Sequence, residues 1–499
     1  MTSLAIPLAI PVVLPFAAAA ALWALRARPV ARRRLSLAAA AAQVAAAAAV
    51  FAGVRAHGVT AQTMGGWPAP FGVTLVADAA SATLLLLAMI VAALVLAFAT
   101  ADVSETEERR GFSALAHALL GGVSGAFLTG DLFNLYVWFE VALIASFGLM
   151  ALRDGVEARE AAIRYAAMNL VATMAILLGV GLLYGATGAL NMAELARALE
   201  GRGAEAAVMA PAALLFFGFA AKAGFFPLFF WLPESYHAPS QSVTALFSAL
   251  TTKVAVYALY RVFSLVFDIA ATPGLGALLL WSSLVTMVVG ALGAGAQTGV
   301  RRILAFHIVS QIGYMGLGLA LGGVAGLAAG LFHLGHNMLA KTNLFLTGAV
   351  AARITGSEEL SRMGGLWAAR PGLSLLFLLS ALAMAGMPPL SGFWAKFLIL
   401  HESFARGWWI AGAVALGTGL LTLYSMTKIW AEAFWKAHPD PAWVPAAAPR
   451  SMLWAAGAMA ALIAAMGLAI GPAYGLAEAA GRALADRGPY LAAVLGEAS

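Results

Sequence analysis

Long apolar runs follow one another along this chain, separated by short polar segments. Each run has about 20 residues or more, the length that an α-helix needs to cross the hydrocarbon core of a bilayer. They leave no stretch long enough for a large soluble domain. The pattern predicts an all-α polytopic membrane protein with about 14 transmembrane helices, at residues 3–26, 33–55, 74–100, 111–129, 130–151, 161–185, 205–231, 240–267, 273–294, 301–321, 323–352, 372–402, 407–436 and 450–475.

The seventh and twelfth of these predicted helices contain similar interruptions. AGFFPL at 223–228 matches AGMPPL at 385–390, at an offset of 162 residues. Proline inside a helix removes a backbone hydrogen bond, so both helices should be broken. The copies lie five helices apart, and an odd spacing turns the second copy upside down in the membrane. We expect two inverted five-helix repeats at 111–267 and 268–436, preceded by helices 1–3 within 1–110 and followed by the last helix and a tail at 437–499.

Composition agrees with a membrane protein and excludes several kinds of chemistry. Hydrophobic residues make up 62% of the 499 positions and charged residues 10%, whereas soluble chains are about 25% charged. The absence of cysteine excludes disulfides, iron–sulfur clusters and thiolate-held haem within this chain. We expect no cofactor and a transporter component rather than an enzyme.

Basic residues predict the orientation, since Lys and Arg concentrate on the cytoplasmic side of membrane proteins. With the N-terminus outside and 14 alternating helices, the inside loops hold 18 Lys and Arg, the outside segments 7 and the membrane interior 4. Both termini are therefore expected outside. The first helix has no basic segment before it and is expected to be retained rather than cleaved. The net charge of +6 follows from this arrangement and gives little support to a nucleic-acid partner.

All four basic residues at membrane depth are lysines, whereas none of the 23 arginines needs to be buried. A lysine at the centre of a membrane helix costs roughly 2.5–3.5 kcal/mol on insertion scales and is a functional-site hypothesis by default. A desolvated lysine can release its proton, but an arginine keeps its proton in a protein. The pattern favours proton carriers over structural cations at Lys222, Lys253, Lys341 and Lys396.

Carboxylates near the membrane interior are the candidate partners of these lysines. Helix 130–151 begins with GDLFNLYVWFE, and Glu140 lies nine residues beyond Asp131, about 14 Å along the axis. A buried carboxylate beside a lysine can stay charged, so Glu140 is the first candidate partner of Lys222. The alternative is that it only hydrogen-bonds a neighbouring helix. Asp131 is interpreted mainly as a helix cap, with a secondary role in proton transfer, and Asp78 as an acid that opens its helix.

Histidines add to the candidate proton path. His333, Asn337 and Lys341 recur every four residues and His336 flanks them, which predicts one polar stripe on an apolar helix. A two-histidine metal site is the competing interpretation, but no carboxylate lies nearby and the lysine would repel a cation. The preceding helix carries His307, four residues before a glutamine.

The loop after the first break also carries titratable groups. Glu234 and His237 lie in PESYHAP and are candidates for passing protons from the cytoplasm, with ordinary loop polarity as the alternative. This loop links the seventh and eighth predicted helices.

Several motifs in a fixed order resemble a known family. Over about residues 75–435, the chain is similar to the antiporter-like subunits shared by Mrp-type multisubunit sodium/proton antiporters and respiratory complex I. The motifs that carry the similarity are GDLFNLYVWFE, AKAGFFPLFFWLPESYHAPS, RRILAFHIVSQIGYMGLG, the helix with the polar stripe from His333 to Lys341, and MPPLSGFWAKFLIL. The resemblance implies a charged pair of Glu140 and Lys222 and a terminal proton site at Lys396. It also implies that the buried axis between them continues through Lys253, His333, His336 and Lys341.

The resemblance further implies a place in a larger assembly of the bacterial inner membrane. Its partners would be other subunits of an antiporter complex, including a larger homologous antiporter-like subunit, and sodium exchange would belong to the whole complex. One departure concerns the histidines, because complex I relatives often carry a second histidine where this chain has Asn337. Together with a lysine instead of glutamate at 396, this favours the Mrp type and leaves open which histidine carries protons.

We therefore expect protons to move along the axis when the Glu140–Lys222 pair opens. With its counter-ion gone, Lys222 would release its proton through water toward Lys253, the stripe and Lys396. The alternatives are a proton-pumping membrane-arm subunit of NADH:quinone oxidoreductase or a related hydrogenase, and a stand-alone carrier of a small solute.

Overall fold

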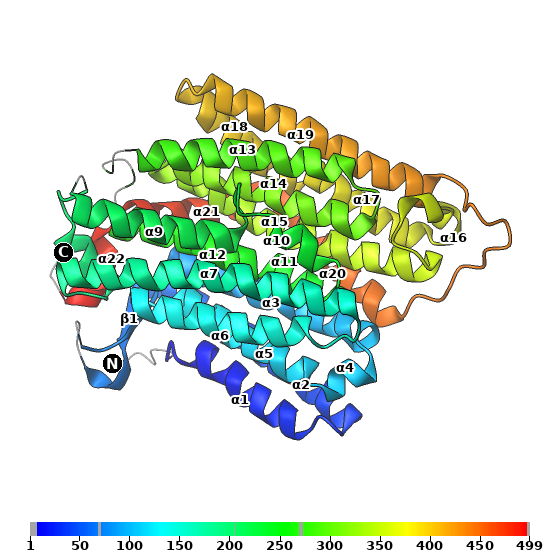
Figure 1. Cartoon of the computed structure of the whole chain (residues 1–499), viewed down its shortest axis with the longest axis horizontal. Helices are drawn as coiled ribbons and strands as arrows, with labels where there is room; N and C mark the ends of the chain where they lie inside the picture. Colours follow the sequence, from blue (N-terminus) through cyan, green and yellow to red (C-terminus); the bar gives the residue numbers. More distant parts are fainter. Residues whose placement is uncertain are drawn as a thin grey trace.

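The computed structural model describes residues 7–67, 71–203, 205–267, 269, 272 and 274–496. In that part the chain is mostly helical, and the long helices run side by side along the long axis of the molecule (Figure 1). The helices are α1 (Ile10–Ala24), α2 (Pro29–His57), α3 (Ala79–Asp102), α4 (Glu105–Arg109), α5 (Phe112–Leu128), α6 (Leu132–Met150), α7 (Val156–Thr187), α8 (Met192–Ala198), α9 (Ala206–Ala223), α10 (Trp231–Tyr236), α11 (Gln241–Ala249), α12 (Thr251–Arg261), α13 (Leu275–Ala296), α14 (Val300–Leu321), α15 (Gly323–Thr355), α16 (Leu366–Ala369), α17 (Pro371–Ala385), α18 (Ser391–Ala405), α19 (Trp409–Ile429), α20 (Arg450–Leu468), α21 (Ile470–Ala485) and α22 (Gly488–Leu495).

Short segments complete the described structure. Two strands pair antiparallel, with Thr60 opposite Ala77 and Thr63 opposite Thr74. Their bounds, and those of the short 3-10 and π segments, are β1 (Thr60–Thr63), β2 (Thr74–Ala77), η1 (Met64–Gly66), η2 (Val262–Val266), η3 (Leu360–Arg362) and η4 (Trp430–Trp435).

Ten helical segments of the described chain are long and apolar enough to cross a membrane. Three further apolar helices, α1, α5 and α17, are shorter. The protein is therefore a membrane protein, as the apolar runs predict. The predicted helix starts at residues 3 and 273 lie outside the described residues.

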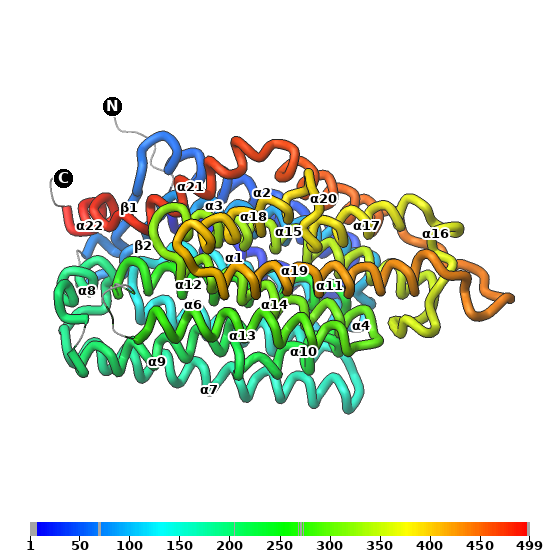
Figure 2. The backbone as a smooth tube through the Cα atoms, turned by 90° about the horizontal axis from the view of Figure 1, so that it is seen from above, coloured from blue at the N-terminus to red at the C-terminus, as the bar shows by residue number. Residues whose placement is uncertain are grey.

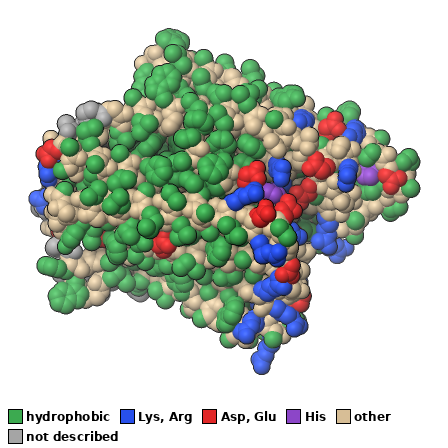
Figure 3. Space-filling view, in the orientation of Figure 1, with side chains coloured by type: hydrophobic (Ala, Val, Ile, Leu, Met, Phe, Trp, Pro, Cys, Tyr) green, Lys and Arg blue, Asp and Glu red, His purple; other side chains and the backbone are tan. Residues whose placement is uncertain are grey.

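The two ends of the bundle differ. The β1–β2 hairpin, α8 and α22 gather at one end, which we call the hairpin end, whereas α4 and α16 lie toward the other end (Figures 1 and 2). Most charged side chains visible in the space-filling view cluster toward that second end, which we call the charged end (Figure 3). The surface between the two ends is dominated by hydrophobic side chains, as expected where lipid or other subunits cover it.

Both predicted breaks occur in the structure. Helix α9 ends at Ala223 and α17 ends at Ala385, each followed by a glycine in the left-handed region, Gly224 with φ +91° and Gly386 with φ +95°. In each break the residue after the glycine donates its N–H to the carbonyl five positions earlier, as in a Schellman cap. The broken ends therefore satisfy part of their own backbone.

Other elements differ from the expectation of simple helices. The run 74–100 begins in β2, so the fold is not purely α-helical. The run 240–267 is divided at Leu250 into α11 and α12, with no glycine or proline to mark the division. The last run is divided at Ala469 into α20 and α21, and Pro472 lies in the first turn of α21, where its missing N–H costs no helix hydrogen bond. The short α4, α8, α10, α16 and α22 were not predicted as separate helices.

Three helical segments form the centre of the bundle. The segment from α11 through η2 and the helix α14 are almost entirely buried by other parts of the chain, and nearly every residue of α15 is buried. These same segments carry five of the predicted proton-path residues, Lys253, His307, His333, His336 and Lys341. Their polar groups therefore face protein rather than lipid.

Candidate functional site

The predicted axis lies in the centre of the bundle. Lys253 on α12, His307 on α14 and Lys341 on α15 are completely buried. Completely buried polar side chains also include Gln311, His333, His336 and Asn337. A membrane helix accepts such residues where they face one another inside the protein. The charge of Lys253 acts on both Lys341 and His333, and that of Lys341 acts on His307, so the structure brings the α14 and α15 candidates near Lys253.

Glu140 and Lys222 lie on neighbouring parts of α6 and α9. The charge of Glu140 acts on Lys222, but the two described side chains do not make a direct ion pair. The ammonium group of Lys222 instead lies 5.3 Å from the ring centroid of Phe139, a distance at which a cation and an aromatic face attract each other. Glu140 is half-buried, and its Oε1 has no hydrogen-bond partner in the described structure. The carboxylate of Glu140 and the ammonium group of Lys222 are thus not in the direct contact expected from the sequence.

A small cavity connects Lys222 with α12. It has about 30 Å³ of free space, enough for one or two water molecules, and Lys222, Ser146, Asn169, Thr251 and Val254 are among its lining residues. Thr251 begins α12, and Lys253 follows two residues later, with its ammonium group 3.4 Å from the Thr252 hydroxyl. Water in this cavity would shorten the gap between the two lysines.

Lys341 lies close enough to Lys253 and Lys396 for the charges of both to act on it. Lys253 and Lys396 both act electrostatically on Lys341, and the same two lysines act on His333. Like charges in a desolvated space repel each other, so a proton on Lys341 is disfavoured while Lys253 and Lys396 are charged. The arrangement favours passing a limited number of protons between sites.

The two stripe histidines have different surroundings. Nδ1 of His336 lies 2.9 Å from the hydroxyl oxygen of Ser391, the first residue of α18 after the second break. The ring of His333 stacks on Tyr314 at a centroid distance of 5.1 Å, and neither of its ring nitrogens has a partner in the described structure. His336 is therefore oriented by a hydrogen bond, whereas His333 is held by packing.

Lys396 joins the stripe to the second break. Its ammonium group donates a hydrogen bond to the carbonyl oxygen of Ala385, at 3.1 Å, and lies 5.5 Å from the Tyr314 ring centroid. Only 7% of the side chain surface is exposed. Lys396 thus shares Tyr314 with His333, and this places it directly beside the stripe.

Several buried polar atoms in this region have no protein partner among the described residues. They include Nζ of Lys341 and both ring nitrogens of His307 and His333. Buried polar groups are normally hydrogen-bonded, and water is the partner that proton transfer between them also requires. The chemistry of the site fits a hydrated proton path.

The secondary candidates lie at the ends of helices. Asp131 is the N-cap of α6 and its Oδ1 accepts the N–H of Asn134 at 2.7 Å, as a cap should. Glu234 lies 3.1 Å from Arg164 at the protein surface, whereas the mostly buried His237 has its Nε2 3.2 Å from the exposed Glu157.

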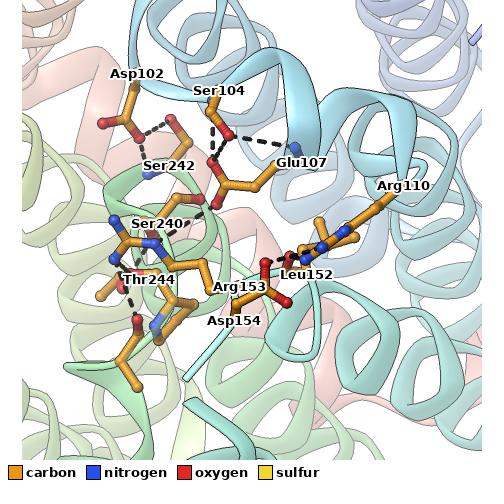
Figure 4. A network of polar contacts seen from close by, with 12 residues as sticks. Asp102, Ser104, Glu107, Arg110, Leu152, Arg153, Asp154, Ser240, Ser242 and Thr244 are labelled. Carbon is orange, nitrogen blue, oxygen red and sulfur yellow. Dashed lines mark hydrogen bonds and ion pairs between the residues drawn. The ribbon is translucent and has the colours of Figure 1, made fainter. Parts of the chain in front are cut away.

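The charged end carries a network of hydrogen bonds around the start of α11 (Figure 4). The carboxylate of Asp102 accepts both the N–H and the hydroxyl of Ser242, at 2.8 and 2.7 Å. In the loop after α6, the hydrogen bond from Arg110 lowers the pKa of Asp154. A polar cleft of about 320 Å³ opens here, with Asp102 and Arg301 among its lining residues. The network fixes the end of α11 that faces this cleft.

Sequence reasoning missed three features of the interior. Tyr314, which contacts both His333 and Lys396, lies on the same face of α14 as His307 and Gln311, three residues after the glutamine, a spacing that could have identified it. Ser391 carried no such signal. The expectation that no arginine needs burial is wrong for Arg261, which is 3% exposed and pairs with Asp78, and also for Arg32 and Arg301.

Two further expectations from the sequence concern Asp78 and a metal site. Asp78 caps α3 as expected, accepting the Ser81 N–H at 2.9 Å. Among the described residues, no group of three or more His, Asp or Glu side chains is placed to hold a metal ion.

A helical membrane bundle with buried lysines and histidines along its centre, and with two broken helices beside them, has the architecture of an ion-translocating membrane subunit. The chain belongs to the family described as NADH:quinone oxidoreductase/Mrp antiporter, TM, whose model matches residues 129–422. The matched range includes both breaks and every residue of the axis.

Individual relatives support the same family. The D subunit of the Na⁺/H⁺ antiporter of Alkalihalophilus pseudofirmus is 43% identical over 381 residues, which cover 76% of this chain and 77% of that protein. A chain of the Mrp complex from Dietzia sp. superposes with a TM-score of 0.92 and 33% identity, covering 99% of this chain and 100% of the other. A chain of respiratory complex I from Thermus thermophilus superposes with a TM-score of 0.80 and 25% identity, covering 96% and 100%.

Proposed function

We propose that this chain is the D-type, proton-translocating subunit of a multisubunit Na⁺/H⁺ antiporter. The observation that carries the proposal is the line of buried bases on α12, α14, α15 and α18, in a chain that is 43% identical to the D subunit of such an antiporter. The relatives' names describe antiporter subunits and not enzymes, in agreement with the transporter expected from the sequence.

The proposed path begins at Glu140 and Lys222. When the pair closes, the carboxylate stabilises the protonated lysine; when it opens, the lysine releases its proton more readily. The proton then passes through the cavity beside Thr251 to Lys253. From there it follows His333, His336 and Lys341 to Lys396, with His307 beside the stripe. Asp131, Glu234 and His237 have secondary roles near the ends of the path.

We further propose 14 membrane crossings with both termini outside, in a bacterial inner membrane. The ten long helical segments, the three shorter apolar helices and the buried α15 together make fourteen. The Lys and Arg side chains that gather at the end opposite α22 support an inside location for that end (Figure 3).

Two inverted repeats, at 111–267 and 268–436, would explain the matching breaks. Both broken helices end in a left-handed glycine, Gly224 or Gly386, and both have a lysine close by. Lys222 lies in the last turn before the first break, and Lys396 donates to the last carbonyl before the second. Broken helices at corresponding places of two repeats are typical of transporter sites.

Other subunits are required by this proposal. Glu140 is a half-buried carboxylate at membrane depth with an unpartnered oxygen in the described structure. A polar group of a neighbouring subunit would lower the free-energy cost of placing this carboxylate in the membrane. The neighbours would include a larger homologous antiporter-like subunit. Sodium exchange is assigned to the whole complex.

The second candidate is a membrane-arm subunit of NADH:quinone oxidoreductase or a related hydrogenase. The family description and the complex I superposition favour it. The Mrp superposition has the higher TM-score and identity, and the lysine at position 396 agrees with the Mrp type. Neighbouring genes distinguish the two: small membrane subunits favour the antiporter, and flavin and iron–sulfur subunits favour the redox complex.

The decisive experiment measures sodium-dependent proton movement in inverted vesicles from an antiporter-deficient host that expresses the whole gene cluster. Glu140→Ala should abolish exchange while the complex still assembles. The matched control is Glu432→Ala, which removes a carboxylate paired with Lys436 near the charged end and should leave exchange intact. Full exchange in the assembled Glu140→Ala complex would refute the proposed path.

A further inference from the structure

A second polar line leaves the axis at Lys253. Lys253, Tyr257 and Arg261 follow one another at four-residue intervals on α12 and are all buried, so they lie on one face of the helix. Arg261 lies about 12 Å beyond Lys253 along the helix axis, toward the hairpin end. Protons at Lys253 thus have a polar surface leading away from Lys341.

An ion pair lies across this line. Nη2 of Arg261 is 2.6 Å from Oδ2 of Asp78, and the two side chains are 3% and 1% exposed. Arg261 also donates from Nε and Nη2 to the Tyr257 hydroxyl, at 3.2 and 3.1 Å, and that hydroxyl donates to the carbonyl oxygen of Phe127 at 3.0 Å. The side chains of Asp78, Tyr257 and Arg261 therefore hold one another in place through hydrogen bonds.

The C-terminal helix α22 covers the ion pair. The guanidinium carbon of Arg261 lies 5.2 Å from the ring centroid of Tyr490, which is itself 2% exposed. Beside the ring lies Gly130, where a Cβ atom would come within 3.0 Å of the Tyr490 hydroxyl oxygen. Arg487 fixes the start of α22 by donating to the carbonyl oxygen of Ser264 at 2.9 Å. The line is thus closed by packing as well as by charge.

Arginine is suited to interrupt a proton path. Its guanidinium keeps its proton in proteins, so it can neither receive nor pass on a proton as lysine or histidine can. Asp78 holds that guanidinium in place across the line, with Nη2 of Arg261 2.6 Å from its Oδ2. In water-conducting pores, an arginine serves in the same way as an electrostatic barrier against protons.

We propose that the Arg261–Asp78 ion pair, covered by Tyr490, is a seal that stops protons from leaving the axis at Lys253 toward the hairpin end. The proposal rests on the proton path proposed above. Without the seal, protons would bypass Lys341 and Lys396 and cross without exchange for sodium. The role of the two residues is to close a route and not to carry protons.

The test uses the whole complex in vesicles and measures the decay of an imposed pH difference without sodium. Arg261→Lys keeps a cation beside Asp78 but introduces a group that can release its proton, and several-fold faster decay is expected. The matched control is Arg32→Lys, a buried arginine paired with Glu105 at 2.9 Å near the charged end, which should leave the decay unchanged. Assembly of each complex is checked in the same membranes.

An assembled Arg261→Lys complex with unchanged decay would overturn the seal. If that variant fails to assemble, Tyr490→Leu provides the test, because it keeps the ion pair and removes only its aromatic cover. Faster decay then supports the seal, and unchanged decay overturns it. The leak is measured without sodium, whereas Glu140→Ala tests exchange, so a failure of the seal is distinguishable from a failure of the path.

Discussion

The ammonium group of Lys396 donates a hydrogen bond to the carbonyl oxygen of Ala385, which joins the last lysine of the axis to the second helix break. Ala385 is the final residue of α17, and the free carbonyls at a helix C-terminus carry partial negative charge. Lys222 lies in the last turn of α9, before the first break. At each break, the partly negative C-terminus of a helix therefore lies close to a lysine and can stabilise its positive charge. A change in the geometry of a break would alter how strongly it holds the protonated lysine.

Lys396→Arg should abolish proton exchange although the positive charge is kept. Arginine can still donate to the Ala385 carbonyl, but it does not release its proton at physiological pH. We expect at least a tenfold loss of sodium-dependent proton movement in inverted vesicles, with the complex assembled.

A second lysine provides the control for this substitution. Lys428 on α19 also donates to backbone carbonyls, those of Gly295 at 3.1 Å and Gln297 at 2.8 Å, but it lies outside the axis. Lys428→Arg should leave exchange unchanged. If Lys396→Arg also exchanged at the normal rate, Lys396 would be a structural cation and not a proton site.

Ser391→Ala tests whether His336 relays protons. Ser391 holds Nδ1 of His336 at 2.9 Å, and the hydrogen bond at one ring nitrogen determines which tautomer the ring adopts. Loss of one hydrogen bond is worth about 1 kcal/mol, which corresponds to roughly a fivefold slower exchange if the whole effect falls on the rate-limiting step. The rate is measured as in the preceding experiment, at saturating sodium.

Ser403→Ala is the control, because its hydroxyl donates to the carbonyl oxygen of Ile399 on its own helix, at 2.7 Å, and has no other partner among the described residues. Ser391→Thr keeps a hydroxyl and should restore part of the rate. An unchanged rate in Ser391→Ala would show that this orientation of His336 is dispensable and would favour His333 as the proton carrier.

The sequence predicts the features that depend on length and composition. The apolar runs identify the long helices, and the Gly and Pro signals at 223–228 and 385–390 identify the two breaks. The burial of the four lysines also follows, because they lie at the depth of the bilayer within these runs.

Features that depend on rotation about the helix axes could not be predicted. Arg261 lies near the outer end of the predicted helix 240–267 and is therefore expected outside the membrane. The rotation of α12 instead turns its side chain inward to Asp78, 183 residues earlier in the chain. Glu140 and Lys222 have suitable depths, but in this structure they do not form a direct pair. The division at Leu250 also has no local signal, since neither glycine nor proline lies in α11 or α12.

Gly386→Ala should destabilise the protein without removing any polar group. Gly386 has φ +95°, a conformation that costs an L-amino acid roughly 1–2 kcal/mol. The added Cβ would also lie 3.0 Å from Cδ of Lys396, so the lysine side chain would have to shift. We expect a lower melting temperature of the complex in detergent together with slower exchange. Gly417→Ala, in the interior of α19 with no atom within 4 Å of the new Cβ, should leave both properties unchanged. Equal melting temperatures for the two variants would mean that the second break can adopt another backbone conformation, and the link between break and lysine would then lose its support.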